Sequence, residues 1–425
     1  MSLRETVRPG RLAAVSTEPA PVSYRSVLAH REFRAVLLSQ GLSVLGDQLA
    51  RLALAVMVFR QTGSAFAASA TYAVPMLTYL VAGPILSSLA DRWSRRRIMV
   101  ASDGVRVAFV VLLATPHLPL VAVFILLGLM GLATPAFESA RAATLPDMLP
   151  GEAYPRGVAL YNLVHQGSQV VGFLVGGALL AELSVSQVLL LDAATFTLSA
   201  VTLRFTLDAR PATAASGFSL LRDTADGIRL VFTDPRLRRL LGFALLSAAA
   251  VAAPESVAVP VAKEMGGGAL ASGVLTASLP AGFLLASFAV LRVDTDRRER
   301  LLLPLAALTA LPLMLTPLSS SLAVTAGLWV AGGMGSSMQL IANASYVVAA
   351  PIHARGRAYG MAAALLMAVQ GISQLLVGAL ASVLTSRSAV ALVAAGTLLL
   401  LSLLRGNRDS TLKKADRLVD GALDV

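Results

Sequence analysis

Uncharged stretches long enough to cross a bilayer set the strongest limit on what this chain can fold into. The segment from Ser64 to Ala90 contains no Asp, Glu, Lys or Arg, and about 20 helical residues span the hydrocarbon core. Similar blocks recur along the chain and predict twelve membrane-spanning helices, at approximately 34–59, 65–90, 98–115, 120–141, 157–181, 185–205, 238–262, 268–291, 301–317, 322–349, 358–384 and 388–404. The predicted fold is therefore an all-α membrane protein.

The composition supports this class and excludes several activities. The chain is 56% hydrophobic and 14% charged, whereas soluble domains carry about 25% charged residues. It has no cysteine, so disulfides and thiolate metal sites are excluded. The sequence contains no phosphate-binding Walker A motif, no metal-ligand cluster and no nucleophile–base pattern. We therefore expect neither an enzyme nor an ATP-driven pump, and no cofactor.

The positive charge is distributed as a membrane topology requires. Of the 35 Lys and Arg residues, 30 fall in the two tails and in the loops that share their side, and only Arg60, Lys263 and Arg387 fall in the opposite loops. Because Lys and Arg concentrate in cytoplasmic loops, we predict that both termini are cytoplasmic. The net charge of +11 then reflects topology, and no nucleic-acid partner is expected.

The chain divides into two halves of six predicted spans. The predicted regions are a cytoplasmic tail (1–33), a six-helix bundle (34–206), a cytoplasmic linker (207–237), a second bundle (238–404) and a C-terminal tail (405–425). In the linker, Phe218, Leu221, Ala225, Ile228 and Phe232 share one helical face, which favours a helix along the membrane interface, although a flexible linker stays open. Duplicated six-helix halves are typical of secondary transporters, whose binding site lies between the halves.

Asp47 is the most informative ionisable residue, because it lies near the middle of the first span, where a charge is costly. Gln40, Ser43, Asp47 and Arg51 share one helical face, which we expect to line a cavity. Asp47 and Arg51 are spaced to form an ion pair. Two roles stay open for them: proton or substrate coupling, which we favour, or a permanent structural pair.

Other polar residues in the predicted spans are weaker candidates for a cavity. They are Asn162, His165, Gln166 and Gln169, then Ser336, Gln339, Asn343 and Tyr346, then Gln370 and Gln374. Amides also hold membrane helices together, and a lone His165 can simply be a satisfied polar residue. We expect the rest of the wall to be apolar, with Tyr72, Met76, Tyr79, Met361 and Met367 available, which suits a bulky amphipathic molecule.

Four charged residues lie near the ends of predicted spans. Glu138 and Arg141 lie at the cytoplasmic end of the fourth span, where we expect them to pair. Asp192 and Glu255 lie nearer the opposite face. Because water reaches that face, we expect both of these carboxylates to be structural.

The loop LADRWSRRRI, with Leu89, Ala90, Asp91, Arg92, Arg95 and Arg96, resembles the signature loop of the major facilitator superfamily. Ser87 and Ser94 replace its two glycines. The resemblance implies that Asp91 caps the eleventh helix and closes the cytoplasmic side, and Asp103 and Arg106 are positioned to join this gating cluster. The alternative is that these arginines only fix topology.

Neighbouring segments, including FRAVLLSQGLSVLGDQLARLAL and AFESARAATLPDMLPGEAY, resemble the macrolide-efflux and siderophore-exporter branch of this superfamily. That branch consists mostly of proton-driven exporters. The antiporter pattern of its fifth helix is represented here by the helix-packing glycines Gly172, Gly176 and Gly177, but Phe173 replaces a proline.

The expected function is therefore proton-coupled export of a hydrophobic or amphipathic small molecule, such as a drug, antibiotic, siderophore or other secondary metabolite. The expected partners are that molecule, protons and the lipid bilayer, and we expect a monomer. Two alternatives stay open. One is a lipid or metabolite translocator of the same fold without proton antiport, and the other is a membrane scaffold or sensor that transports nothing.

Overall fold

The computed structural model describes residues 23–87, 93–208, 229, 231–351 and 355–402, and these residues form helices and connecting turns without a β-strand. The first half holds α1 (Tyr24–Ala29), α2 (Arg31–Thr62), α3 (Ala65–Ser87), α4 (Arg95–Leu113), α5 (Leu120–Met148), α6 (Ala153–Glu182) and α7 (Val185–Thr206). The predicted all-α fold is confirmed for this part of the chain.

The second half is built from more pieces. It holds α9 (Pro235–Ser256), α10 (Ala258–Glu264), α11 (Ala269–Leu291), α12 (Thr295–Arg298), η2 (Glu299–Leu301), α13 (Leu302–Met314), η3 (Thr316–Leu318), α14 (Leu322–Ser336), α15 (Met338–Ala349) and α16 (Arg355–Ala381). An apolar helix at Ser386–Ser402 follows. Within the described residues, eight helical stretches are long and apolar enough to cross a membrane: Arg31–Thr62, Leu120–Met148, Ala153–Glu182, Val185–Thr206, Pro235–Ser256, Ala269–Leu291, Glu299–Leu318 and Ala358–Ala381.

Two predicted continuous spans are broken, and the prediction is wrong in that respect. The span predicted at 238–262 divides between α9 and α10 at Val257, three residues after Pro254, whose ring removes a helix hydrogen bond. The span predicted at 322–349 divides between α14 and α15 at Ser337. The residues before this break include three glycines, which weaken a helix interior, and the Ser337 hydroxyl donates 2.7 Å to the carbonyl of Met334.

Local capping fixes several helix ends. Ser184 begins α7 with a reciprocal capping box, in which its hydroxyl accepts from the Gln187 N–H and Gln187 accepts from the Ser184 N–H. Asp234 caps α9 by accepting from two backbone N–H groups, and Pro235 follows at the first helical position. Gly63 ends α2 with φ of 64°, a left-handed conformation that glycine adopts without strain.

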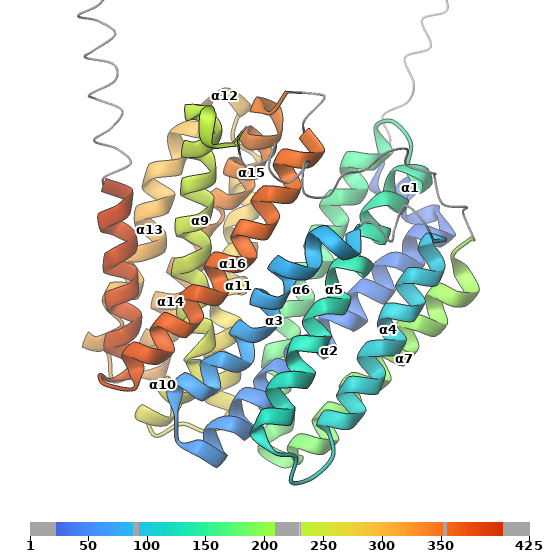
Figure 1. The fold of residues 1–425 in the computed structure, drawn as a ribbon. Helices are drawn as coiled ribbons and strands as arrows, with labels where there is room; N and C mark the ends of the chain where they lie inside the picture. The colour runs from blue at the N-terminus through green and yellow to red at the C-terminus, as the bar shows by residue number, and fades with distance from the viewer. Residues whose placement is uncertain (1–22, 88–92, 209–228, 230, 352–354, 403–425) are drawn as a thin grey trace, which may run out of the picture.

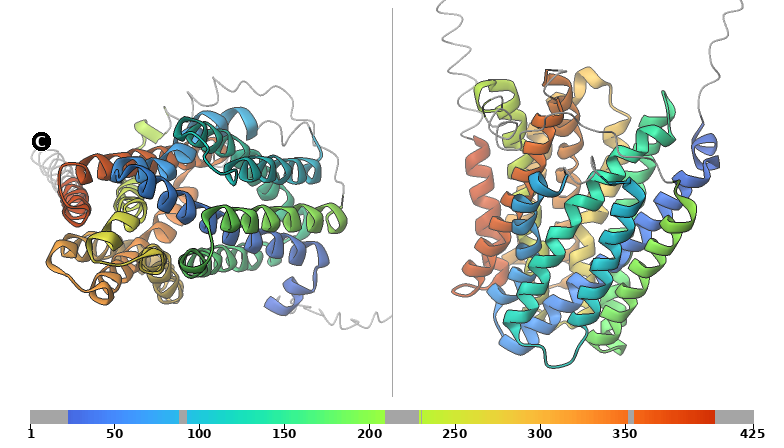
Figure 2. Two further views of the ribbon diagram at one scale, coloured as in Figure 1. Left: turned by 90° about the horizontal axis from the view of Figure 1, so that it is seen from below. Right: turned by 45° about the vertical axis from the view of Figure 1, so that its right-hand side comes forward.

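The helices of the two halves form two groups that lie side by side (Figures 1 and 2). The described chain begins and finishes at the same end of the molecule, which we call the tail end (Figure 1). We call the opposite end the far end. The ribbons of the two groups draw apart toward the tail end and converge toward the far end (Figure 1).

Small residues join the two halves near the far end. A Cβ atom on Gly177 of α6 would lie 2.9 Å from the Cα of Gly273 on α11, and one on Gly378 of α16 would overlap Ser69 of α3. Glycine lets membrane helices approach at backbone distance. The helix pairs α6 with α11 and α3 with α16 therefore form the main contact between the halves.

Gly172 and Gly176 serve α6 in a different contact, because they face α2 within the same half. A Cβ atom on Gly172 would lie 2.8 Å from the carbonyl oxygen of Leu45, and one on Gly176 would lie 3.2 Å from a methyl group of Leu49. The three predicted helix-packing glycines thus lie at close helix contacts, two within a half and one between halves.

Several predicted features lie outside the described residues. These are residues 1–22 of the N-terminal tail, the whole C-terminal tail, the signature-loop residues Leu89, Ala90, Asp91 and Arg92, and most of the linker, including Phe218, Leu221, Ala225 and Ile228.

Candidate functional site

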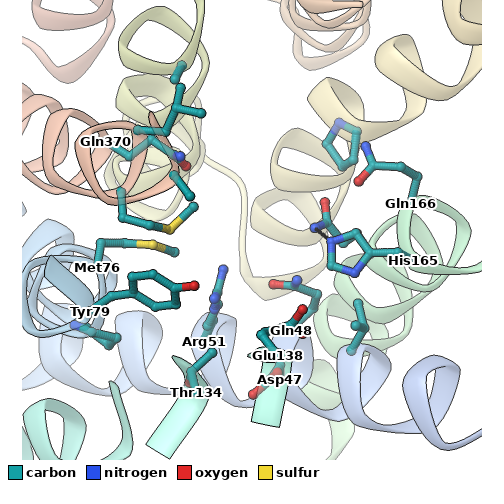
Figure 3. Close-up of a pocket in the computed structure, with 18 of the residues that line it drawn as sticks. Asp47, Gln48, Arg51, Met76, Tyr79, Thr134, Glu138, His165, Gln166 and Gln370 are labelled. Atoms are coloured by element: carbon teal, nitrogen blue, oxygen red, sulfur yellow. Dashed lines mark hydrogen bonds between the residues drawn. The ribbon is translucent and has the colours of Figure 1, made fainter. Parts of the chain in front are cut away.

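A cavity of about 540 Å³ lies between the two halves and is lined by α2, α3, α4, α5 and α6 on one side and by α9, α11, α14, α15 and α16 on the other (Figure 3). Most of the predicted site residues line it: Gln40, Ser43, Asp47, Arg51, Met76, Tyr79, Arg106, Glu138, Arg141, Asn162, His165, Gln166, Gln169, Gln339, Gln370 and Gln374. The volume is within the range of small-molecule binding sites.

The predicted polar face of α2 forms one wall of this cavity. Gln40, Ser43, Asp47 and Arg51 all line it, one helical turn after another. The intervening Gln48 also lines the cavity, and its Cβ packs against Gly172 of α6. Only a residue as small as glycine lets α6 come this close, so the glycine on α6 holds the polar face of α2 in position.

Asp47 and Arg51 form no ion pair among the described residues, which argues against the alternative of a permanent structural pair. Neither side chain takes part in any of the ion pairs of the described chain. The guanidinium of Arg51 instead interacts electrostatically with two carboxylates, those of Asp47 and Glu255. Figure 3 shows Arg51 projecting upward with Tyr79 on one side of it and Gln48 on the other. A carboxylate free of a fixed partner can bind a proton or a cationic group.

His165 of α6 is held by amides on both ring nitrogens. Its Nδ1 lies 3.2 Å from Gln40 Nε2, and its Nε2 lies 3.0 Å from Gln169 Nε2. A neutral imidazole has one donor and one acceptor nitrogen. As drawn, both ring nitrogens face amide N–H donors, and Gln40 Oε1 has no partner. Exchanging the oxygen and nitrogen of the Gln40 amide lets His165 Nδ1 donate to Gln40, while Nε2 accepts from Gln169. This arrangement fixes the ring at the cavity wall.

Glu138 and Arg141 of α5 form the expected ion pair. The Arg141 guanidinium also lies 3.9 Å from the centre of the Tyr161 ring, a cation–π contact. Tyr161 in turn stacks on His165, with ring centres 6.3 Å apart. The four side chains form a continuous row across α5 and α6 at the cavity wall.

Asp103 and Arg106 of α4 connect the cavity to the interior of the first half. Arg106 lines the cavity, lies over the rings of Phe137 and Phe196 at 5.1 and 5.3 Å, and pairs with Asp103 at 3.6 Å. Asp103 is fully buried and accepts a 2.6 Å hydrogen bond from Ser199. Asp103 is therefore part of the packing between α4 and α7, away from the cavity.

Arg95 and Arg96 of the signature loop make contacts within the first half at the tail end. Arg95 binds Asp147 and the carbonyl of Ala143 on α5, while Arg96 donates 3.1 Å to the carbonyl of Leu207 after α7. These two arginines fasten α4 to its neighbours in the state that the structure describes.

The second half supplies a mostly apolar wall. Its lining residues are Ala248, Val251, Glu255, Leu279, Pro280, Phe283, Ser336, Gln339, Tyr359, Ala363, Leu366, Met367, Gln370 and Gln374. Glu255 is the charged residue of this wall and lies at the far-end terminus of α9. The expectation that its role is only structural stays a prediction. One signal in the sequence could have pointed to Glu255, because it follows Pro254 directly, next to the break between α9 and α10.

Four predicted cavity residues lie elsewhere. Tyr72 is 2% exposed and packs in the apolar core of the first half. Asn343 is exposed outside the cavity, Tyr346 donates 3.1 Å to the carbonyl of Ala358, and Met361 packs against the core of the second half. Of the polar face predicted for this region, Ser336 and Gln339 line the cavity, whereas Asn343 and Tyr346 do not.

Asp192 of α7 also departs from the sequence prediction. It was expected near a water-accessible face, but it is completely buried. It packs against α2 at Gly46, the residue before Asp47.

Comparisons with known proteins identify the family. A sequence profile described as "Major Facilitator Superfamily" matches residues 36–362. The chain belongs to this superfamily. Members of this superfamily are multi-pass membrane carriers, so the resemblance predicted from the signature loop is confirmed, and the family agrees with the prediction of a carrier and not an enzyme.

The related proteins include efflux pumps. "Uncharacterized MFS-type transporter YfiS" of Bacillus subtilis (strain 168) is 31% identical over 171 residues, which cover 40% of this chain and 41% of that protein. "Multidrug efflux pump Tap" of Mycolicibacterium fortuitum is 26% identical over 353 residues, 79% of this chain and 86% of the pump. "Macrolide efflux protein A" of Streptococcus pyogenes is 23% identical over 165 residues, 38% of this chain and 41% of that protein. The chain thus spans less than half the length of two of these relatives.

Solved structures share the fold at low identity. A bacterial homologue of the human lysosomal transporter Spinster, in an inward-facing and unoccupied conformation, matches with a TM-score of 0.69 at 14% identity, over 88% of this chain and 95% of that one. The peptide transporter POT in complex with sulfate matches with a TM-score of 0.71 at 14% identity, over 92% and 98%. These likenesses confirm the major facilitator fold.

Proposed function

We propose that this chain is a proton-coupled exporter of hydrophobic or amphipathic small molecules that works by alternating access. Twelve spans cross the membrane with the tail end in the cytoplasm, as the distribution of Lys and Arg indicates. The efflux pumps among its relatives support export. The observation that carries the proposal is Asp47, a carboxylate that lines a cavity between the two halves and has no ion-pair partner among the described residues.

The two walls of the cavity favour an amphipathic substrate. The first half contributes charged groups and amides, including Asp47 and His165, whereas the second half contributes mainly aliphatic and aromatic side chains such as Phe283 and Leu366. A substrate with one polar and one apolar side can satisfy both walls at once. The flexible side chains of Met76 and Met367, one from each half, adapt to different apolar shapes.

Asp47 supplies the coupling step in this proposal. When the cavity opens to the outside, Asp47 takes up a proton and the substrate leaves. When the cavity faces the cytoplasm, the proton leaves and the carboxylate is again available to substrate. Binding of proton and substrate at one carboxylate is mutually exclusive, which is what antiport requires.

The test is transport by the purified protein in liposomes, with a panel of fluorescent dyes and macrolide antibiotics. A proton gradient should drive accumulation by the wild-type protein, and Asp47→Asn should abolish that accumulation. The variant should still exchange labelled for unlabelled substrate without a gradient, because exchange needs no net proton movement. Asp294→Asn, at an exposed carboxylate outside the cavity, is the matched control and should behave as wild type.

Each contrary result identifies a different error. Wild-type transport that ignores the gradient would reject proton coupling and favour a translocator without antiport. Normal gradient-driven transport by Asp47→Asn would reject the role of this carboxylate. Failure to move any compound of the panel, by a protein that is folded and inserted, would reject the proposed substrate class.

A further inference from the structure

A second carboxylate, Asp192, lies directly behind the cavity wall. It belongs to α7, is completely buried, and its carboxylate abuts α2 at Gly46, where a Cβ atom would collide with Asp192 Oδ1 and with the hydroxyl of Thr195. Asp192 Oδ2 has no hydrogen-bond partner among the described residues. Burying an ionised carboxylate without a hydrogen-bond partner costs free energy, which favours the neutral, protonated form of Asp192.

Gly46 places Asp192 next to the coupling residue. Asp47 follows Gly46 on α2 and lines the cavity, while Asp192 approaches the same helix from the side of α7. Thr195, one turn after Asp192, donates 2.8 Å to the Asp192 carbonyl and lies 3.4 Å from its Oδ1. The two carboxylates therefore face the same short segment of α2 from different sides.

The charges in this region do not balance if every carboxylate is ionised. The charged groups that act on Asp192 are Asp47 from α2 and Arg106 from α4, and Arg106 is already paired with Asp103 of α4. Arg51 acts on both Asp47 and Glu255. With the neighbouring pair of Glu138 and Arg141 included, three guanidinium groups face five carboxylates, and the low dielectric of the membrane interior disfavours the excess negative charge.

We propose that Asp192 is a second protonation site, closed off from the cavity, that exchanges one proton with Asp47. In the resting state the Asp192 carboxylic acid is neutral and Asp47 is a carboxylate. Transfer breaks the O–H bond at Asp192 and forms one at Asp47, which leaves the charge on Asp192 near Arg106. The absence of a side chain at Gly46 lets the Asp192 carboxylate reach α2 one residue away from Asp47.

This inference rests on the proposed function for the role of Asp47, and it adds an internal store for the transported proton. Loss of substrate from Asp47 leaves that carboxylate unpartnered, and the nearby proton on Asp192 can neutralise it. Asp47 is then neutralised by the proton from Asp192, and the conformational change does not require a proton to arrive first from the outside solution. Arg106 stabilises the charge that remains on Asp192.

The protonation state is tested by infrared spectroscopy on the purified protein, independently of transport. Labelling with carbon-13 aspartate should shift a protonated-carboxyl band present at neutral pH, and Asp192→Asn should remove it. Asp147→Asn, which alters an exposed carboxylate at the tail end, should keep it. Absence of an aspartic acid band from the labelled wild type at neutral pH would overturn the proposal, whether or not the variant folds.

The exchange with Asp47 is tested in liposomes. Asp192→Asn should retain substrate exchange without a gradient, because the cavity residues are unchanged, and should lose the wild-type pH dependence of gradient-driven transport. An unchanged pH profile in a folded variant would reduce Asp192 to a packing residue and overturn the proposal. If the wild-type protein itself ignores the gradient while the infrared band belongs to Asp192, the proposed proton-coupled function fails but the protonation site stands.

Discussion

Adding a methyl group at Gly177 should push the protein out of the state that the structure describes. A Cβ atom at this position would lie 2.9 Å from both the carbonyl oxygen of Ala269 and the Cα of Gly273 on the opposite half. Both neighbours are backbone atoms, so no side-chain rotation relieves the overlap. The two halves must separate at this point of the far end.

The size of the effect follows from the energy of overpacking. An added methyl group in a close-packed contact costs about 1–3 kcal/mol. Since 1.4 kcal/mol is about a factor of ten in an equilibrium constant, the balance between the two conformations should shift roughly 5- to 150-fold. The helix propensity that alanine gains over glycine, about 1 kcal/mol, is present in both conformations and cancels.

The shift can be measured with spin labels, because the chain has no cysteine of its own. Cysteines introduced at the exposed positions Gln61 and Ser382 report the separation of the halves at the far end by pulsed electron double resonance. Gly177→Ala should increase the long-distance population. Gly167→Ala on the same helix, where a Cβ meets nothing within 4 Å, is the matched control. An unchanged distance distribution in Gly177→Ala, or an equal change in both variants, would refute the packing argument.

Three further substitutions test contacts within the halves by thermal unfolding in detergent. Ser199→Ala removes the 2.6 Å hydrogen bond to the buried Asp103 carboxylate and should cost about 1–3 kcal/mol, so an unchanged midpoint would show that the carboxylate does not depend on this donor. Arg236 donates a 2.9 Å hydrogen bond to the Glu299 carboxylate, and protonation of that carboxylate in acid removes the charge that this ion pair needs. Because this pair is largely exposed, Glu299→Gln should cost only about 0.5 kcal/mol at neutral pH and nothing in acid, and a cost that persists in acid would contradict this. Trp329→Ala empties a fully buried site and should cost about 3–5 kcal/mol; a cost below that of the serine variant would argue against a close-packed second half.

The polar face of α2 could be predicted from the sequence because two rules act together there. Helical spacing fixes which residues share a face, and the cost of polar groups in lipid turns that face inward. Gln40, Ser43, Asp47 and Arg51 follow both rules, and all four line the cavity. The same spacing placed Gln339, Asn343 and Tyr346 on one face of α15, but only Gln339 lines the cavity, because Tyr346 binds the carbonyl of Ala358 within its own half and Asn343 is exposed.

The positions of Asp192 and Glu255 could not be predicted from the sequence. The place of a residue along a predicted span indicates its depth in the membrane, but it does not indicate which other helix its side chain contacts. Asp192 is buried because Gly46 on another helix leaves space for it. Glu255 reaches the cavity from the end of α9, just before the break at Val257. Both positions depend on contacts between helices that are far apart in the chain.

The ion pairs of the described residues suggest how the two halves move. Each pair joins residues of the same half: Arg95 with Asp147, Arg106 with Asp103, Arg141 with Glu138, Arg156 with Glu152, Arg236 with Glu299 and Arg387 with Glu264. The contact between the halves relies instead on close packing at glycines. Separating the halves at these positions therefore requires no ion pair to break in the low-dielectric interior, where breaking one is costly. Each half can move as a rigid body, and the charge state of Asp47 has to act through the cavity and its substrate.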